Sequence, residues 1–345
     1  MAHFHSSDLA YLMPPVRLRW KRHKLQFRTP ARTSRGVLEE RITYIIEAEN
    51  EYGTGLGECC IMPGLLPEIK ETELDFWCEL VEKRQSLHPF EAPSPIQFGL
   101  ESALTAARNA PLARWNTPFA RGEDSILIHH LIWMGNEDKM LQSAEAGVAG
   151  GFTCLKLKIG ALGWQNEHRL LSTLRNQYPT IEIRVDANGA FGYDEVKPIL
   201  HDLAELGVSF IEQPLRRGNW EQMAELCRIS PTPIALDEEL LNHSERAEQA
   251  DILLDAIQPQ AIVIKPSLHG GLLAAENWAA CAEQRGIKWW VNSALESNIG
   301  LTSLAEWCAL RAPGMMQGLG TGRLFTDNLR APVQLKGTRL YYTPS

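Results

Sequence analysis

Two patterns of apolar and polar positions alternate along the chain from residue 126 onward. Short apolar runs, typical of buried strands, are each followed by a segment with apolar residues at three- and four-residue spacing, which predicts a helix. The predicted strands cover residues 126–134, 153–159, 181–186, 208–212, 233–237, 261–265 and 287–291, with a weaker one at 316–319. Eight strands alternating with helices predict an α/β fold, a parallel barrel of the (β/α)8 type.

The first 125 residues follow a different pattern. Residues 41–47 and 52–58 resemble two strands around a turn, and residues 67–86 and 96–107 resemble helices, which predicts an α+β capping domain at 1–125. Residues 27–38 lack clear periodicity and suggest a mobile loop, either a lid or a linker. The barrel is then expected at 126–320, and the alternation within 321–345 predicts a strand that returns to the cap.

Charged residues stand at the C-terminal ends of successive predicted strands. From Lys158 the steps to Asp186, Glu212, Asp237 and Lys265 are 28, 26, 25 and 28 residues, about the length of one strand plus one returning helix. Active sites of parallel barrels lie at the C-terminal ends of their strands. The spacing therefore predicts a ring of catalytic groups at one rim.

The three acids of this ring predict a metal site. Neighbouring strands lie roughly 4.8 Å apart, so Asp186, Glu212 and Asp237 would converge and repel one another. A hard divalent cation removes this repulsion, and an all-oxygen set suits Mg²⁺ better than zinc, with Mn²⁺ as an alternative. The competing interpretation is that each acid only caps the helix that follows it.

The lysines predict acid–base chemistry. Lys156 and Lys158 are two residues apart, so both side chains leave the same face of a strand, whereas Lys265 lies four strands away in a ring of eight. Like charge and partial burial lower a lysine pKa toward neutrality, where the amine can act as a base. A substrate between the lysines could lose a proton next to its carboxylate; reprotonation would then give epimerisation, and loss of a leaving group would give elimination. A K-x-K pair alone would more often be a solvated edge strand.

Charge and residue composition indicate which kinds of partner to expect. The formal net charge is −8 and no dense basic cluster is present, so a nucleic-acid partner is not expected. No apolar run is long enough for a membrane helix and the first residues do not resemble a signal peptide, so we expect a cytoplasmic protein without a membrane partner. The seven cysteines form no C-x-x-C pair and are interpreted as reduced structural thiols. Oligomeric state is not indicated.

These charged residues, called the ladder below, are Lys156, Lys158, Asp186, Glu212, Asp237 and Lys265. The ladder lies in motifs that resemble a known family. LKLKIG, VDANGAF, FIEQP, ALDEE, VIKPSLHGG and NSALESNIGL occur in the order found in the muconate-lactonizing-enzyme-like group of the enolase superfamily, after YGTGLGECC in the cap. The resemblance implies a modified (β/α)7β barrel with a capping domain and bound Mg²⁺. It also implies roles for six residues: Lys158 as base, Lys156 as its neighbour, Lys265 as the opposing cation, and Asp186, Glu212 and Asp237 as metal ligands.

Within that group the chain looks most like the o-succinylbenzoate synthases, on LIWMG, IKPSLHGG, SALESNIGL and GLGTGRLFTDN. This implies dehydration of 2-succinyl-6-hydroxy-2,4-cyclohexadiene-1-carboxylate, a step of menaquinone biosynthesis, through an enediolate. N-succinylamino acid racemase and dipeptide epimerase are alternatives that share every catalytic residue. A barrel used only for binding or structure is a third, against which the presence of all six residues argues. His129 and His130 depart from the expected pattern and leave the wall near the first strand open.

Contacts to a small carboxylate substrate are also expected outside the ladder. Ser293, Glu296 and Ser297 follow the seventh strand, and the free amides of residues 298–300 could hold a second carboxylate. An ordinary helix cap explains Ser297 equally well. Asn188, in VDAN, and Arg32, in the predicted lid, are further substrate-binding candidates, although Arg32 could be a plain surface arginine.

Overall fold

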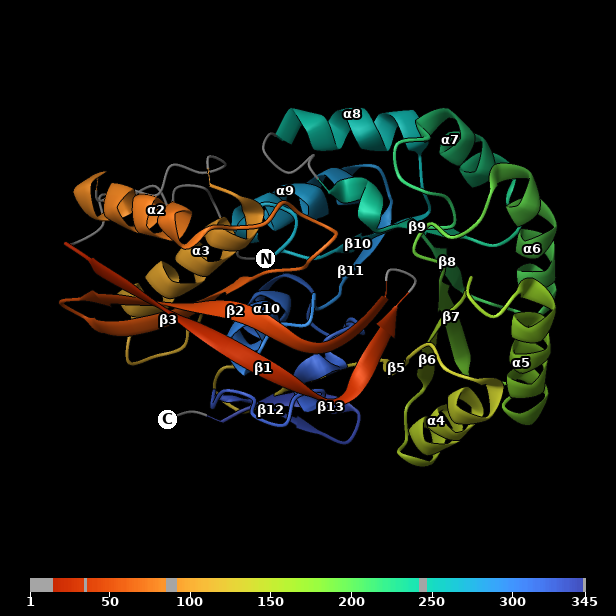
Figure 1. Ribbon diagram of the computed structural model, residues 1–345, viewed down its shortest axis with the longest axis horizontal. Helices are drawn as coiled ribbons and strands as arrows, with labels where there is room; N and C mark the ends of the chain where they lie inside the picture. Colours follow the sequence, from red (N-terminus) through yellow and green to blue (C-terminus); the bar gives the residue numbers. More distant parts are fainter. Residues whose placement is uncertain (1–14, 34–35, 85–91, 242–246, 344–345) are drawn as a thin grey trace.

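Seven parallel strands form a curled sheet, and helices run along its outer side (Figure 1). This computed structural model describes residues 15–33, 36–84, 92–241 and 247–343. The sheet consists of β5 (His130–Ile132), β6 (Cys154–Lys158), β7 (Glu182–Asp186), β8 (Phe210–Glu212), β9 (Ile234–Leu236), β10 (Ala261–Ile264) and β11 (Lys288–Val291). The helices are α4 (Glu137–Ala149), α5 (Trp164–Gln177), α6 (Tyr193–Glu205), α7 (Trp220–Ile229), α8 (Ala247–Ile257), α9 (Gly271–Gln284) and α10 (Asn298–Arg311).

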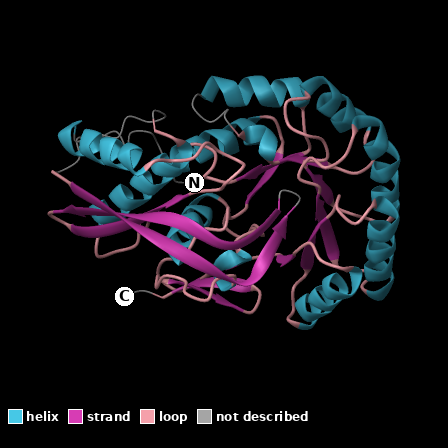
Figure 2. Cartoon of the chain, in the orientation of Figure 1, coloured by secondary structure: helices cyan, strands magenta, loops and turns pink. Residues whose placement is uncertain are grey.

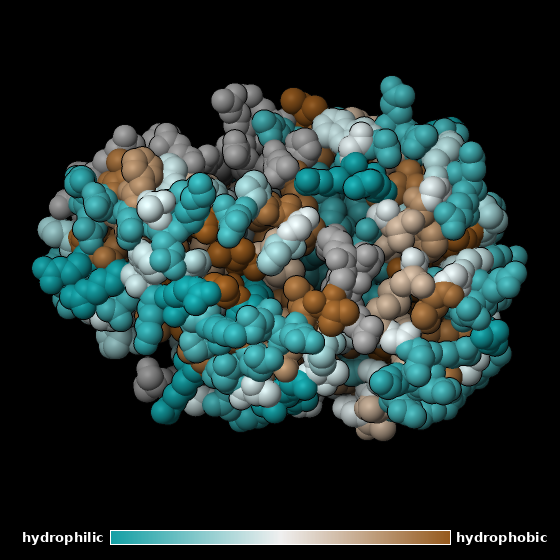
Figure 3. Space-filling model, viewed as in Figure 1, coloured by the Kyte–Doolittle hydropathy of each residue, from teal (hydrophilic) through white to brown (hydrophobic). Residues whose placement is uncertain are grey.

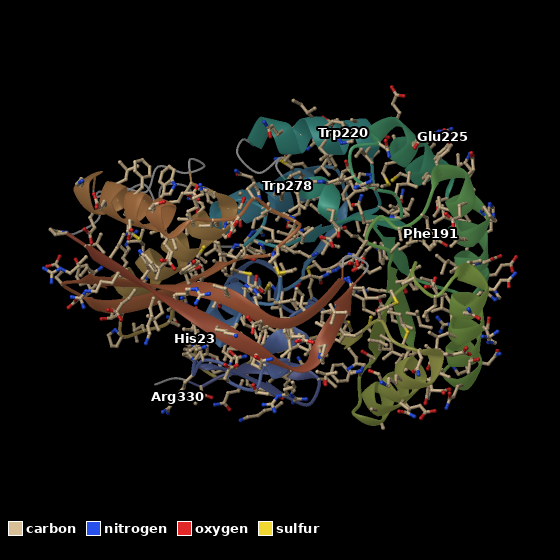
Figure 4. All side chains as sticks on the ribbon, in the orientation of Figure 1. His23, Phe191, Trp220, Glu225, Trp278 and Arg330 are labelled. Atoms are coloured by element: carbon tan, nitrogen blue, oxygen red, sulfur yellow. The ribbon has the colours of Figure 1, made fainter. Side chains whose placement is uncertain are left out.

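The order of strands and helices follows from where apolar side chains can be buried. The outer faces of the strands are apolar and pack under the helices, with Leu155, Leu157 and Val185 among the buried residues. The inner faces of β6 and β7 also carry charged residues, such as Lys156 and Arg184. In α6 the buried residues are Val196, Ile199, Leu200 and Leu203, at the spacing of one helix face. Figure 2 shows the resulting layers, and Phe191, labelled in Figure 4, belongs to the core between them.

The ring closes through a very short eighth segment. Gln317 bridges Ile128, which precedes β5, and Gly318 bridges Asn292, which follows β11. The two outer strands of the sheet therefore meet through residues 317–318, where a weaker strand was predicted. The predicted α/β barrel with a capping domain is confirmed.

One predicted strand is divided in two. β4 (Ser125–Leu127) pairs with β13 (Arg339–Tyr342), which also pairs with β12 (Val333–Lys336), whereas β5 pairs with β6. The prediction of a single strand over residues 126–134 was wrong, because the continuous apolar run carries no signal for a change of partner. The predicted C-terminal strand exists as β13, with β4 as its neighbour, and the division of the chain into domains stays a prediction.

The first part of the chain forms a three-stranded antiparallel sheet covered by two helices. The strands are β1 (Arg17–Thr33), β2 (Gly36–Asn50) and β3 (Gly53–Cys60), and the helices are α2 (Glu71–Arg84) and α3 (Ser94–Asn109). The predicted strands at 41–47 and 52–58 and both predicted helices are confirmed. β1 was missed, because charged residues such as Arg19, Lys21 and Lys24 interrupt its buried positions, among them Leu18 and Leu25.

The expected irregular loop at residues 27–38 is a strand hairpin over its described part. β1 continues to residue 33 and pairs with β2, with a register shift between Gln26 and Ala31. This hairpin is held from the far end of the chain: Phe27 bridges Phe325, and the Thr326 amide donates to the Gln26 carbonyl at 2.9 Å. A bulged strand lacks strict alternation, which explains why its pattern read as a loop.

Surface features add little to this picture. Polar side chains cover most of the face drawn in Figure 3, and the large exposed apolar side chains are spread over both parts of the chain. All seven cysteines are free and buried, as expected of structural thiols. Among the described residues, no helix has the length and apolar character that crossing a bilayer requires.

Candidate active site

The acidic residues of the ladder lie together at the C-terminal rim of the barrel. Asp186 and Glu212 are the last residues of β7 and β8 and pair in register, and Asp237 directly follows β9. Each is at most 1% exposed. One carboxylate oxygen of each lies within 4.8 Å of the other two. The parallel register, with Lys158 paired to Asp186 on the neighbouring strand, brings these groups together.

Three ammonium groups face the three acids. Lys156 Nζ lies 3.0 Å from Asp186 Oδ2 and also bonds Glu212, while Lys158 Nζ lies 2.7 Å from Asp186 Oδ2. On the other side, Lys265 Nζ lies 2.5 Å from Asp237 Oδ2. The six groups of the ladder therefore form one buried charge network, with Lys158 and Lys265 at its two flanks.

Burial and opposite charge set the protonation of this network. Burial opposes the charged form of Lys156, but Asp186 and Glu212 outweigh it and raise its pKa. Burial would likewise raise the pKa of Asp186, but Lys156 and Lys158 lower it. For Glu212 burial dominates and raises the pKa to about 7. Two neighbouring ammonium groups were expected to lower the pKa of Lys156. The pKa is raised instead, because three carboxylates face this lysine.

The acid cluster has the composition of a site for a hard cation. Glu212 Oε1 is buried and has no hydrogen-bond partner, although buried polar oxygens nearly always have one. Three carboxylates supply only oxygen, which is the ligand type that Mg²⁺ and Mn²⁺ take. Asp186, Glu212 and Asp237 could thus hold a divalent cation, with Glu212 Oε1 as an oxygen still able to bind it.

Asn188 contacts the predicted base directly. Its Oδ1 accepts from Lys158 Nζ at 2.7 Å, and its Nδ2 donates to Glu238 Oε1 at 2.9 Å. The residue has a φ of 46°, in the left-handed region, which asparagine tolerates better than most residues. In the structure Asn188 orients Lys158, and its predicted contact with substrate stays a prediction.

Two further amides support the site and were not singled out from the sequence. Gln213 Oε1 accepts from the backbone amides of Asp237, at 3.0 Å, and Glu239, at 3.2 Å. When the side-chain amide of Asn292 is rotated by 180°, its oxygen accepts a hydrogen bond from Lys156 Nζ at 2.9 Å. Each directly follows a strand-end position, Gln213 after Glu212 and Asn292 after β11, so their place in the ladder was a usable signal.

The segment after β11 is held by hydrogen bonds within the protein. Glu296 is fully buried and accepts from the hydroxyls of Ser267 and Ser293 and from the Ala294 amide, the last at 2.8 Å. Ser293 Oγ also accepts from Thr321 Oγ1 at 2.6 Å. Burial raises the pKa of Glu296, whereas the two serine hydroxyls lower it. These contacts fix the shape of the segment, and binding of substrate by Ser293 or Glu296 stays a prediction.

The N-terminus of α10, where an anion was expected to bind, already holds a carboxylate of the chain. Glu58, on β3, accepts from the Ser297 amide at 3.0 Å, from the Ser297 hydroxyl and from the Gly300 amide at 2.9 Å. The Asn298 amide donates to Asn328 Oδ1 at 2.8 Å. Ser297 is also the N-cap of α10, which agrees with the plainer interpretation of this residue.

The two histidines near the first barrel strand pack within the protein. His129 is 4% exposed, and burial together with Lys156 lowers its pKa well below the usual value. His130 Nε2 lies 3.0 Å from the Ser143 carbonyl on α4. His130 therefore faces a helix of the outer layer.

A cavity of about 800 Å³ lies beside the rim, between the β1 hairpin and the segments that follow β5 and β6. Its lining includes Trp133, Leu162 and the cationic residues Arg28, Lys139 and Arg323. The backbone of Arg32 pairs with Val37 in the same hairpin, and its side chain lies outside the described part. The predicted contact of Arg32 with substrate therefore stays a prediction.

Comparison with known proteins places this arrangement in a family. A family model described as Enolase C-terminal domain-like matches residues 139–338. An o-succinylbenzoate synthase from Desulfotalea psychrophila is 38% identical over 94% of this chain and 98% of its own length. The chain belongs to the enolase superfamily. The predicted resemblance is thereby confirmed.

Other members of the superfamily share the fold. The crystal structure of MenC from Desulfotalea psychrophila has a TM-score of 0.79 at 34% identity and covers 95% of this chain and 100% of that chain. A muconate lactonizing enzyme from Pseudomonas fluorescens has a TM-score of 0.81 at 22% identity, with 96% and 94% covered. An N-succinylamino acid racemase from Amycolatopsis is 26% identical over 93% of this chain and 90% of its own length.

Proposed function

We propose that this protein is an o-succinylbenzoate synthase, a Mg²⁺-dependent lyase that dehydrates 2-succinyl-6-hydroxy-2,4-cyclohexadiene-1-carboxylate. The observation that carries the proposal is the 38% identity to such an enzyme over nearly the full length of both chains. The buried network of Lys156, Lys158, Lys265 and the three acids supports it, because proton abstraction next to a carboxylate needs a base and nearby positive charge.

Lys158 is the proposed base. Its Nζ is held by Asp186 and Asn188, each at 2.7 Å, and its side chain is 13% exposed at the rim. In the proposed reaction Lys158 Nζ takes the proton from the ring carbon that bears the carboxylate. Its ammonium form then gives that proton to the departing hydroxyl, so the C–H and C–O bonds break, a C=C bond completes the aromatic ring, and water leaves.

The positive charges of the site have separate parts in this scheme. Lys265, equally 13% exposed, presents an ammonium group from the flank opposite Lys158, where it would stabilise negative charge developing on the substrate carboxylate. Asp186, Glu212 and Asp237 would hold Mg²⁺, which supplies further positive charge to that carboxylate when bound. Lys156, 5% exposed and bonded to two of the acids, would orient them and add positive charge beside Lys158.

Racemisation is the second candidate, since it would use the same first step. An N-succinylamino acid racemase from Thermus thermophilus is 32% identical over 78% of this chain and 75% of its own length. Reprotonation by Lys265 from the opposite face would invert the carbon, whereas elimination needs a leaving group and only Lys158.

Parallel assays decide between the two activities. We expect loss of the cyclohexadiene absorbance and formation of o-succinylbenzoate with Mg²⁺, and no turnover with EDTA. Racemisation of N-succinyl amino acids should be slower by at least about tenfold in kcat/KM. Faster racemisation than dehydration would overturn the proposal in favour of the racemase.

A further inference from the structure

Glu58 lies where the cap strand β3 meets the N-terminus of the barrel helix α10. The residue is fully buried, and each carboxylate oxygen accepts two hydrogen bonds. Oε1 accepts from Thr43 Oγ1 at 2.8 Å and from the Ser297 amide at 3.0 Å. Oε2 accepts from the Ser297 hydroxyl and from the Gly300 amide at 2.9 Å. All four donors are protein groups, and they satisfy both carboxylate oxygens.

The contact uses the polarity of the helix. The first amides of a helix have no acceptor within it and carry partial positive charge, so a carboxylate beside them is stabilised. The carboxylate at the start of α10 belongs to Glu58, on the remote strand β3. Glu58 precedes Ser297 by 239 residues and Gly300 by 242 residues. Gly300 leaves room for it, since a Cβ there would lie 2.8 Å from both Glu58 Oε2 and Glu296 Cβ.

A second cap residue holds the same segment. The Arg41 guanidinium, 3.9 Å from Glu58 Oε1, donates through Nη1 to the Ala294 carbonyl at 3.3 Å and through Nε to the Ile61 carbonyl at 3.1 Å. Cys60 Sγ also lies 3.3 Å from the Ala294 oxygen. The positive charge of Arg41 balances the negative charge of buried Glu58. Both side chains attach the cap to residues 294–300.

The held segment is linked to the site at two points. Asn292, which precedes it, contacts Lys156, and Glu296 within it accepts from Ser267, two residues beyond Lys265. Leu295 has a φ of 68°, so the segment turns through a conformation that surrounding contacts must maintain. Cap and rim are thus joined through one buried polar cluster.

We propose that Glu58 is a positioning residue that fixes residues 294–300, the segment between Asn292 and α10, and with it one side of the barrel mouth where substrate binds. The part of this inference that concerns substrate rests on the proposed function. Glu58 touches neither Lys158 nor the three acids, so its removal should weaken substrate binding more than the chemical step.

Two variants test the contact from both sides. Glu58→Gln keeps the shape but replaces one acceptor oxygen with a donor. Gly300→Ala places a Cβ against the carboxylate and against Glu296 Cβ. We expect amide hydrogen exchange in the peptide 293–303 to speed up at least tenfold in each variant. We also expect KM to rise at least fivefold while kcat changes less than twofold.

Val81→Ala, in the core of the cap and away from α10, is the matched control. It should lower the melting temperature while exchange in 293–303 and KM stay as in the parent protein. Unchanged exchange in Glu58→Gln would overturn the proposal, whatever the result for Gly300→Ala. Exchange is measured without substrate, so it decides the positioning role even if the parent protein does not catalyse the dehydration.

Discussion

At the residue scale, the site depends on pairing each buried charge with an opposite one. Lys158 and Lys156 both contact Asp186 Oδ2. Asn188 also accepts a hydrogen bond from Lys158, so Lys158 Nζ has little freedom to move. A base held in this way loses little entropy when a substrate approaches. Loss of its amine should therefore affect the reaction far more than the fold.

Lys158→Ala should lower kcat at least about a thousandfold, because general acid–base groups contribute about 10²–10⁴ in rate. Lys83→Ala, on α2 of the cap, changes a lysine whose side chain is 73% exposed and serves as the control. Circular dichroism should show both variants folded. Turnover within tenfold of the parent protein would remove Lys158 from the role of base.

Asp237→Asn should weaken Mg²⁺ binding at least about tenfold, since an amide supplies a weaker ligand oxygen than a carboxylate. Titration calorimetry measures this directly. Asp194→Asn changes an acid on α6 whose side chain is 93% exposed, and should leave the affinity unchanged. Equal affinities for the Asp237 variant and the parent protein would exclude Asp237 as a ligand.

At the scale of elements, the cap attaches to the barrel by acids placed at helix N-termini. Glu101, on α3, accepts from the Leu272 and Leu273 amides at the start of α9, as Glu58 does at α10. Burial raises the pKa of Glu101 to about 7 from an ordinary 4.5, although Gln97 and the α9 amides lower it. The acid is therefore kept partly protonated at neutral pH.

This shift predicts a pH dependence of stability. Because the pKa is raised in the folded state, Glu101 contributes stability below about pH 4.5 that is lost as the pH rises through 7. Glu101→Gln stays neutral, so it should match the parent protein at pH 5 and be more stable by about 1–3 kcal/mol at pH 8. Urea denaturation at both pH values measures this, with the exposed Glu51→Gln as control. A stability difference independent of pH would contradict the assignment.

Sequence patterns predicted the elements where burial is periodic and failed where partners are remote. The strand ends bearing Asp186 and Glu212 were identifiable because each closes an apolar run before an amphipathic helix. The sequence did not show that the run at 126–134 forms two strands. The partner of β4 is β13, which is remote in the chain: Arg339 of β13 lies 214 residues after Ser125 of β4. Glu58 looked like an ordinary polar end of a strand, because its partner Ser297 lies 239 residues later in the chain.

At the scale of the whole molecule, metal binding and folding stability should be linked. A ligand that binds only the native state stabilises it by about 2.7 kcal/mol at a concentration one hundred times Kd. The acid cluster is built from strands β7, β8 and β9, so Mg²⁺ should raise the melting temperature of the barrel as a unit. Scanning calorimetry with Mg²⁺ or EDTA measures the shift, and Asp237→Asn should reduce it. Equal melting temperatures with and without Mg²⁺ in the parent protein would argue against a metal site here.

The way the ring closes constrains synthesis on the ribosome. Residues 317–318 join the two outer strands, β13 pairs with β4, and Thr326 holds Gln26 in the first hairpin. A nascent chain that stops before residue 317 has an open sheet edge and a hairpin without its anchor, so its unpaired strands remain available to other chains. Chaperone protection during translation would matter most in that interval, and it would end only once the closing segment has left the exit tunnel.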